Sequence, residues 1–309
     1  HWPGQNRVFV NNGRGIYTVA RTLGNESETS YATELADFDG DGDLDVAVGN
    51  DMAPNFIFLN DGHGEFTKSK SFGAAYAPTR NITVCDVDAD GDMDILITNR
   101  GRENEICLND GRGHFGKSLG FGSKDDSTID VEANDIDNDG DVDLILANRD
   151  EQQNFIYLNN GQLDFSRKIP YGTGVDNTRS VAVADMNNDG FKDIIAANIG
   201  EPTTIYIGDV EMSYANRVDF DTSNDRSYAI ALGDLNRDGK LDLVIGNSRS
   251  PNTVFLNQKE GLSWQGIQLG EEQFNTYDII VDDLNGDDKP DIIESNSDEL
   301  NVYYFNKLE

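Results

Sequence analysis

Short apolar runs recur along the chain at an almost constant interval. They include Ile95–Ile97, Leu144–Leu146 and Leu243–Ile245, and each directly follows an acidic loop. Continuous apolar runs of this length are typical of strands that are covered on both faces. In the first complete repeat the pattern predicts four strands, at residues 31–36, 45–49, 56–60 and 65–69. An Asn-Asp-Gly or Asn-Asn-Gly turn between the last two strands indicates a hairpin.

The acidic loop occurs six times, starting at Asp37, Asp86, Asp135, Asp185, Asp234 and Asp283, so consecutive starts are 49 or 50 residues apart. Six four-stranded antiparallel sheets that cover one another predict an all-β fold, a β-propeller with six blades, with seven as the alternative. The even period favours a single domain over residues 1–309.

Both ends of the chain fall inside a repeat. The last repeat stops after a third strand at 301–306, and residues 16–23 can supply its fourth strand, so we expect pairing of the N- and C-terminal strands to close the fold. Residues 7–11 also read as a third strand, and the pattern leaves open which of the two third strands takes that place.

The acidic loops have the chemistry of a hard-cation site. In Asp37-Phe-Asp39-Gly-Asp41-Gly42-Asp43-Leu-Asp45, carboxylates stand at positions one, three, five and nine and glycine at position six. Ca²⁺ takes six to eight oxygen ligands, which requires several short acidic side chains on one tight loop. Position twelve is apolar and strand-like, which excludes an EF-hand.

We therefore predict up to six Ca²⁺ ions, one for each repeat. Asn replaces Asp at position three in loops four to six, and loop six, with Asp288 at position six and Pro290 at position eight, is expected to be the weakest site. The predicted side-chain ligands are Asp37, Asp39, Asp41 and Asp45; Asp86, Asp88, Asp90 and Asp94; Asp135, Asp137, Asp139 and Asp143; Asp185, Asn187, Asp189 and Asp193; Asp234, Asn236, Asp238 and Asp242; Asp283, Asn285, Asp287 and Asp291.

Composition narrows the classes of partner. The formal charge of −33 over 309 residues excludes a conventional nucleic-acid surface, which needs basic stripes. Cys85 and Cys107 are predicted on the first and third strands of one repeat, too far apart for a disulfide. There is no apolar run near 18 residues and no signal peptide, and the chain starts at His1, so we expect a processed or trimmed protein.

The six loops and the strands after them resemble the FG-GAP or VCBS repeats of integrin α-subunit heads, some fungal lectins and many secreted bacterial proteins. The resemblance covers nearly the whole chain. It implies a propeller, typically of seven blades, with Ca²⁺ in the hairpin that joins the first two strands, on the face opposite the usual ligand face. The family includes adhesion proteins, lectins and polysaccharide-degrading enzymes, so it does not fix the activity.

A ligand is expected where the first strands begin, away from the metal loops. A hydroxyl residue stands seven positions before every loop, and this uniformity indicates a structural role. The next position varies, and its Arg and Tyr side chains can bind carboxylates and stack on sugars. The candidate ligand-binding residues are Arg80, Arg100, Arg149, Arg179, Tyr31, Tyr228 and Tyr277, although local carboxylates such as Asp150 are alternative partners for these arginines.

The sequence favours a binding module over an enzyme, because it contains no recognisable set of catalytic residues. We expect a secreted protein, extracellular or periplasmic, that binds a glycan or an extracellular protein. The alternative is a lyase or hydrolase that acts on an acidic polysaccharide, with an arginine that neutralises the uronate and Tyr31, Tyr228 or Tyr277 as proton shuttle. Candidate acids near the axis are Glu34, Asp130, Glu132 and Asp278, which are more often structural hydrogen-bond partners.

Overall fold

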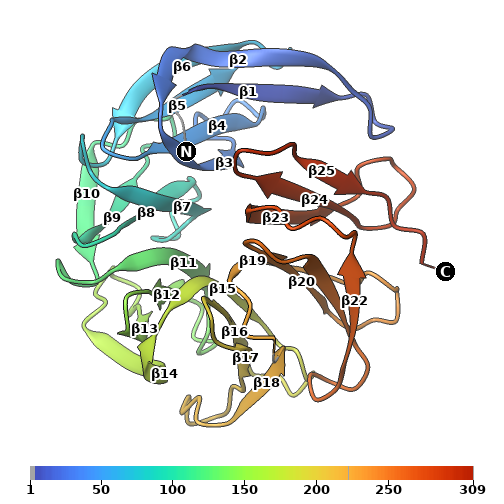
Figure 1. The fold of residues 1–309 in the computed structure, drawn as a ribbon. Helices are drawn as coiled ribbons and strands as arrows, with labels where there is room; N and C mark the ends of the chain where they lie inside the picture. The colour runs from blue at the N-terminus through green and yellow to red at the C-terminus, as the bar shows by residue number, and fades with distance from the viewer. Residues whose placement is uncertain (1–3, 222, 309) are drawn as a thin grey trace. The chain divides into compact units, whose positions relative to one another are not determined.

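The computed structural model describes residues 4–221 and 223–308, so His1 lies outside the described part. Strands and turns make up this part, and it contains no helix (Figure 1). Consequently, none of its elements is a helix that could cross a membrane. The expected all-β class is confirmed.

Each blade is an antiparallel sheet in which neighbouring strands follow one another along the chain. The strands are β3 (Ser30–Ala36), β4 (Asp45–Asn50), β5 (Asn55–Asn60) and β6 (Phe66–Phe72) in blade one; β7 (Thr79–Cys85), β8 (Asp94–Asn99), β9 (Asn104–Leu108) and β10 (Lys117–Phe121) in blade two; β11 (Thr128–Asn134), β12 (Asp143–Asn148), β13 (Gln152–Leu158) and β14 (Arg167–Asp176) in blade three; β15 (Thr178–Ala184), β16 (Asp193–Asn198), β17 (Thr203–Tyr206) and β18 (Arg217–Asp221) in blade four; β19 (Ser227–Gly233), β20 (Asp242–Asn247), β21 (Asn252–Asn257) and β22 (Trp264–Leu269) in blade five; and β23 (Thr276–Asp282), β24 (Asp291–Asn296) and β25 (Val302–Tyr304) in blade six. This is the predicted six-bladed β-propeller fold.

The second strand of a blade is its buried centre. Every residue of β4, β8, β12, β16 and β20 is buried, as the continuous apolar runs predicted. Their side chains pack between consecutive blades; in one such cluster Ile95 and Ile97 of β8 pack with Ile57 and Phe72 of blade one. A strand covered on both faces can bury apolar side chains on each of them.

The chain divides into two compact units. The first comprises residues 1–10, 17–148 and 155–169, and therefore holds blades one and two and most of blade three. The second comprises residues 11–16, 149–154 and 170–309, and holds blades four to six.

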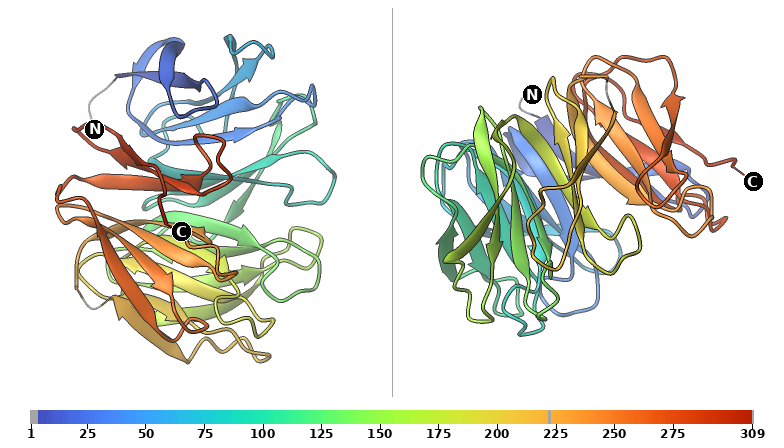
Figure 2. Two further views of the ribbon diagram at one scale, coloured as in Figure 1. Left: turned by 90° about the vertical axis from the view of Figure 1, so that its right-hand side faces the viewer. Right: turned by 90° about the horizontal axis from the view of Figure 1, so that it is seen from below.

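The expected pairing of the terminal strands is wrong. The N-terminal strand β1 (Gly4–Asn11) pairs with β2 (Tyr17–Glu28) in a separate two-stranded sheet, and β25 pairs with β24 alone among the described strands. The hairpin lies beside blade one, where Leu23 packs with Val46 and Val48 (Figure 2). Asn6 Nδ2 also donates to Ser30 Oγ over 2.8 Å, as the third-strand Asn252 does to Thr276 Oγ1 over 2.9 Å. β1 therefore lies against blade one as a third strand lies against the blade that follows it. Because β2 is paired with β1, β2 also stays beside blade one.

Both cysteines are free thiols, as predicted. They lie on β7 and β9, which are separated by β8. Burial raises the pKa of Cys85 to about 12 and that of Cys107 to about 11. Both groups therefore stay protonated at neutral pH and are poor nucleophiles.

Candidate functional site

The first residue of each acidic loop holds the turn together. In loop one, Asp37 Oδ1 accepts a hydrogen bond from the Gly40 amide over 2.8 Å, and Oδ2 accepts one from the Gly42 amide over 2.9 Å. Gly42 has a φ of 93°, a conformation that side-chain-bearing residues rarely adopt. Loop six keeps the same turn with Asp288 at a φ of 63°, which Asp tolerates better than most residues.

The aspartate at position nine joins each loop to the rest of its blade. Asp94 is 1 % exposed; its Oδ2 accepts from the Val87 amide over 3.2 Å and its Oδ1 from the Asn109 amide over 2.7 Å. Burial raises the pKa of Asp94 to about 6 and that of Asp143 to about 7. Position nine is therefore a structural anchor in every loop, whether or not one of its oxygens also contacts a cation.

Loops one to three bring carboxylates together. One oxygen from each of three aspartates lies within 4.8 Å of the others in each loop; the sets are Asp37, Asp39 and Asp41; Asp86, Asp88 and Asp90; and Asp135, Asp137 and Asp143. Burial and the neighbouring carboxylates raise the pKa of Asp39 and of Asp137. In addition, Asp39 Oδ1 and Asp137 Oδ1 are buried and accept no hydrogen bond. A buried carboxylate oxygen without a donor is costly unless a cation compensates it, so these donor sets fit a hard cation.

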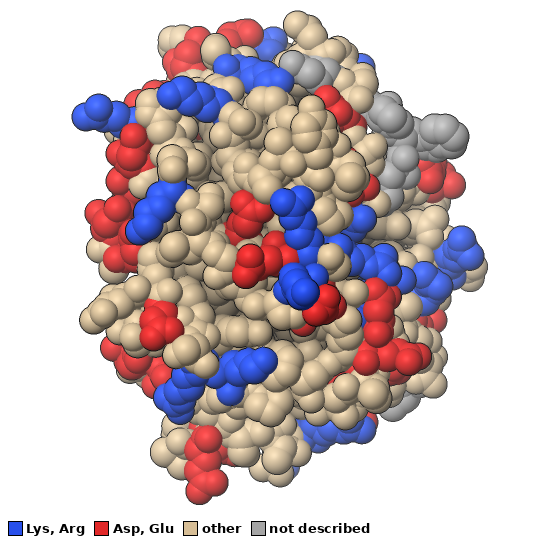
Figure 3. Space-filling view, turned by 90° about the vertical axis from the view of Figure 1, so that its left-hand side faces the viewer, with Lys and Arg blue, Asp and Glu red and all other residues tan. Residues whose placement is uncertain are grey.

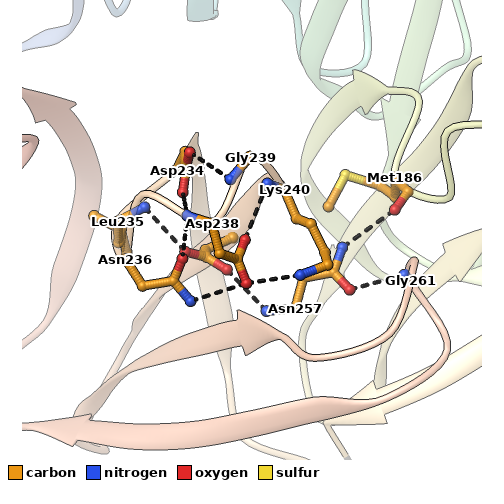
Figure 4. A network of polar contacts seen from close by, with 10 residues as sticks. Met186, Asp234, Leu235, Asn236, Asp238, Gly239, Lys240, Asn257 and Gly261 are labelled. Carbon is orange, nitrogen blue, oxygen red and sulfur yellow. Dashed lines mark hydrogen bonds and ion pairs between the residues drawn. The ribbon is translucent and has the colours of Figure 1, made fainter.

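The later loops partly compensate their own charge. In loop four, Asn187 Nδ2 donates to Asp189 Oδ2 over 2.9 Å. In loop five, Lys240 at position seven places Nζ 2.7 Å from Asp238 Oδ2 (Figure 4). The hydrogen bond from Lys240 lowers the pKa of Asp238. Loop five thus carries an ammonium group on a carboxylate that was predicted to be a metal ligand.

Replacing Lys240 with Asp is expected to increase the calcium affinity of loop five by about tenfold or more. The substitution removes the competing ammonium and restores the aspartate that loops one to three carry at position seven. Calcium titration by calorimetry would measure the change. Lys289→Asp is the matched control, because Lys289 occupies position seven of loop six but donates to the Leu308 carbonyl. Equal effects of the two substitutions would contradict a specific role for Lys240.

The uniform hydroxyl before each loop is structural, as predicted. Thr276 Oγ1 donates to Asn296 Oδ1 over 2.7 Å and accepts from Asn252 of the preceding blade. The same hydroxyl-to-asparagine bond occurs in all six blades, at Ser30, Thr79, Thr128, Thr178, Ser227 and Thr276. These hydroxyls fix the start of the first strand against the end of the second and the neighbouring third strand.

The variable position that follows is a β-bulge in every blade. The strand register shifts there, so one extra residue is inserted opposite the second strand. The six residues are Tyr31, Arg80, Ile129, Arg179, Tyr228 and Tyr277. Bulges redirect a side chain away from the regular alternation of a strand and are frequent near functional sites. The fold therefore places one side chain for each blade outside the regular ladder at this level. Five of the six are Arg or Tyr, and two of the six, Ile129 and Tyr228, are buried.

In the first unit, Arg80 lies over Tyr31. The guanidinium carbon is 4.6 Å from the ring centroid, and Nη1 forms a 2.7 Å ion pair with Asp51. Arg100 occupies the loop after β8, where its backbone bridges to Ser127. The positive charge of Arg80 is thus balanced by a local carboxylate, one of the two outcomes that the sequence left open.

In the second unit, Arg179, Tyr228 and Tyr277 form one cluster. The Arg179 guanidinium lies 5.5 Å from the Tyr228 centroid and 5.8 Å from that of Tyr277, and the two rings meet edge to face at 5.2 Å. Arg226, which the sequence analysis missed, donates to the Tyr228 hydroxyl over 2.8 Å. Arg149 lies in the same unit and approaches Asp150 at 3.7 Å. Arg226 directly precedes the hydroxyl residue Ser227, and this position next to the bulge could have identified Arg226 from the sequence.

Three of the candidate acids lie close together in the first unit. Burial, followed by the nearby charges of Asp130 and Glu34, raises the pKa of Glu132 to about 8. Asp130 Oδ1 accepts a hydrogen bond from Asn81 of blade two. Asp278 accepts one from the Ile279 amide in the second unit. Glu132 is therefore largely protonated at neutral pH.

Charge is mixed on the surface that Figure 3 shows. Acidic and basic side chains are interspersed there, and uncharged residues cover much of the area between them.

Solved structures with similar folds include three proteins of different kinds. An Agrocybe aegerita lectin, described as recognising non-reducing terminal N-acetylglucosamine, has a TM-score of 0.64 and 19% identity over 90% of this chain and 77% of its own. The V. cholerae biofilm matrix protein Bap1 has a TM-score of 0.50 and 19% identity over 79% of this chain and 40% of its own. Chaetomium thermophilum Raptor has a TM-score of 0.60 and 11% identity over 99% of this chain and 25% of its own. At these identities the likeness shows the fold alone.

No curated protein sequence matches the chain. The FG-GAP-like repeat, in contrast, matches it six times, at residues 2–48, 37–97, 86–146, 135–196, 187–245 and 234–294. The matches follow the period of the acidic loops and cover nearly the whole chain. The chain therefore belongs to the FG-GAP-like repeat family.

Proposed function

We propose that this protein is a calcium-stabilised β-propeller module that binds a glycan through the bulged arginine and tyrosine side chains of its first strands. The cluster of Arg179, Tyr228 and Tyr277 carries the proposal, since it places a guanidinium against two aromatic rings at redirected positions. An Arg fork suits a carboxylate and a tyrosine ring suits a sugar face, so the fitting ligand is an acidic sugar.

Calcium is proposed for the acidic loops, with loops one to three as the strongest sites. Their converging carboxylates and the unpaired buried oxygens of Asp39 and Asp137 support this assignment. The bound ions would hold each loop against its blade, while the ligand would bind where the first strands begin. Sites built from several carboxylates suit the millimolar Ca²⁺ found outside cells, and we therefore place the protein in an extracellular or periplasmic setting.

Two observations support an acidic sugar as the ligand. Within the second unit, Arg226 lies beside the same cluster, its guanidinium 5.7 Å from the Tyr228 centroid, so two cations flank one ring. Among proteins of similar fold, the Agrocybe aegerita lectin is described as recognising a terminal amino sugar. In this chain the two arginines favour a sugar that carries a carboxylate.

Binding to immobilised acidic and neutral oligosaccharides tests the proposal in the presence of calcium. Arg179→Ala is expected to weaken binding of the acidic sugars by about tenfold or more, because it removes a charge-assisted contact. Tyr277→Ala should weaken the binding of acidic and neutral sugars to a similar extent. Arg217→Ala is the matched control, because Arg217 is an exposed arginine on β18 that pairs with Asp219.

Two outcomes would overturn the proposal. If Arg179→Ala and Arg217→Ala bind every sugar as the unaltered protein does, the cluster is not the site. If the protein instead releases unsaturated uronates or new reducing ends from an acidic polysaccharide, it is a lyase or a hydrolase rather than a binding module.

A further inference from the structure

One asparagine in blade two contacts two acidic loops at once. Asn109 directly follows β9 and is 7% exposed. Its backbone amide donates to Oδ1 of Asp94, at position nine of loop two, over 2.7 Å. Its side-chain nitrogen donates to the Met93 carbonyl of loop two over 3.1 Å and to the Phe38 carbonyl of loop one over 2.9 Å. A single buried residue therefore bridges the loops of blades one and two.

The carbonyl that Asn109 contacts lies inside the ligand segment of loop one. Phe38 stands directly before the predicted ligand Asp39 and is fully buried. Its amide donates to Oδ2 of Asp45, the residue at position nine, over 3.0 Å. Its carbonyl also accepts from the Gly113 amide of blade two over 2.7 Å. A cation that draws the carboxylates of loop one together would therefore fix the peptide on which the hairpin of blade two rests.

The same bridge occurs in the second unit, between loops four and five. Asn257 directly follows β21 and is fully buried. Its backbone amide donates to Asp242 Oδ1 of loop five over 2.8 Å, and its side-chain nitrogen donates to the Met186 carbonyl of loop four over 3.2 Å (Figure 4). The Gly261 amide donates to Asn257 Oδ1 over 2.9 Å and so holds the side chain in this orientation.

Blade three has an asparagine at the same place without the bridge. The backbone amide of Asn159 donates to Asp143 Oδ1 and its side chain to the Val142 carbonyl, both in its own loop three. Among the hydrogen bonds of the described residues, none joins the Asn159 side chain to Val87, which holds position two of loop two. The first unit therefore contains one linked pair of loops and one pair that this residue does not link.

We infer that calcium binding to loop one and calcium binding to loop two favour each other, with Asn109 as the positioning residue that couples them. This inference rests on the proposed calcium sites. Ordering a loop around a cation costs conformational entropy. When a cation orders loop one, the fixed Phe38 carbonyl holds the Asn109 side chain. The Asn109 backbone amide then holds Asp94, a predicted ligand of loop two, so the ordering of loop two costs less.

Calcium titration followed by hydrogen exchange and mass spectrometry tests the coupling in the full chain, loop by loop. Each loop that binds calcium should gain protection as the calcium concentration rises, and the midpoint of this gain reports the affinity of that loop. Asp39→Ala removes a ligand from loop one and should raise the midpoint at residues 86–94 by about fivefold or more. The midpoint at residues 135–143 should stay unchanged, because Asn159 does not link loop three to loop two.

Reciprocity and a matched pair of variants sharpen the test. Coupling of binding free energies is symmetrical, so Asp88→Ala in loop two should raise the midpoint at residues 37–45 by the same factor. With Asn109→Ala in the background, Asp39→Ala should no longer shift the midpoint of loop two. With Asn159→Ala in the background, the shift should remain. If circular dichroism shows that Asn109→Ala does not fold, the comparison of loops two and three in Asp39→Ala decides alone.

The outcomes separate failure of the coupling from failure of the calcium sites. If the loops gain protection with calcium but Asp39→Ala leaves the midpoint of loop two unchanged, the coupling is wrong and the calcium sites stand. An equal shift in loops two and three would indicate general destabilisation and would also overturn the coupling. If calcium changes the protection of no loop, the proposed calcium sites are wrong, and the inference fails with them.

Discussion

Removing calcium with EGTA is expected to lower the thermal unfolding midpoint by about 10 °C or more, and added Ca²⁺ should restore it. A ligand that binds only the folded state stabilises it by about 2.7 kcal/mol for each site at a hundredfold excess over Kd, and loops one to three each bring three carboxylates within 4.8 Å. Without a cation these carboxylates repel one another across short distances. Differential scanning calorimetry with and without chelator measures the effect.

Two substitutions separate specific binding from general charge effects. Asp137→Ser, in loop three, should remove part of the calcium-dependent stabilisation. Asp61→Asn removes an exposed aspartate from a hairpin turn outside the loops and should leave it intact. A midpoint that EGTA leaves unchanged would contradict a structural role for calcium.

Replacing Glu132 with Gln is expected to stabilise the protein at alkaline pH and to have little effect at pH 5. Burial raises the pKa of Glu132 from 4.5 to about 8, so between these values the folded state holds a proton that the unfolded state releases. Stability therefore falls as pH rises through this window, and the loss is complete above the folded pKa. The Gln variant avoids this loss, so its midpoint at pH 9 should be higher by about 5 °C or more.

The measurement is thermal unfolding from pH 5 to pH 9 with calcium kept saturating. Glu299→Gln makes the same chemical change at an exposed position after β24 and should show no pH-dependent difference. If Glu132→Gln and the unaltered protein have midpoints that change in parallel over the whole range, Glu132 does not ionise with a raised pKa.

The acidic loops and the bulges lie at opposite ends of the first strand and differ in how much they vary between blades. At the loop end of a blade, aspartates such as Asp94 are buried and anchored by backbone amides, which keeps the loop rigid. At the other end of the first strand, the bulge frees one side chain from the ladder, and that residue differs between blades. Rigid repeated loops and variable bulges allow the bulged side chain to differ between blades without loss of the fold.

The sequence by itself determined the fold and the acidic loops. The spacing of Asp37, Asp39 and Asp41 and the following apolar run are local, so a tight turn leading into a buried strand follows from chain geometry alone. The constant period favoured six blades and left seven as the alternative, because each repeat must bury its apolar strand against the next. The hydroxyl before each loop was recognised as structural for the same reason, as all six copies meet the same surroundings.

Contacts between residues far apart in the chain were decided only by the tertiary structure. The pattern that predicts a third strand at residues 7–11 does not say where that strand lies. The structure pairs it with β2 in a separate sheet, and the bond from Asn6 to Ser30 holds it beside blade one. The charge on Arg80 is balanced by Asp51, 29 positions away, and the ring of Phe115 fills a space 77 positions away at Phe38. Periodicity specifies which side chains a strand presents, but packing between blades decides which of them meet.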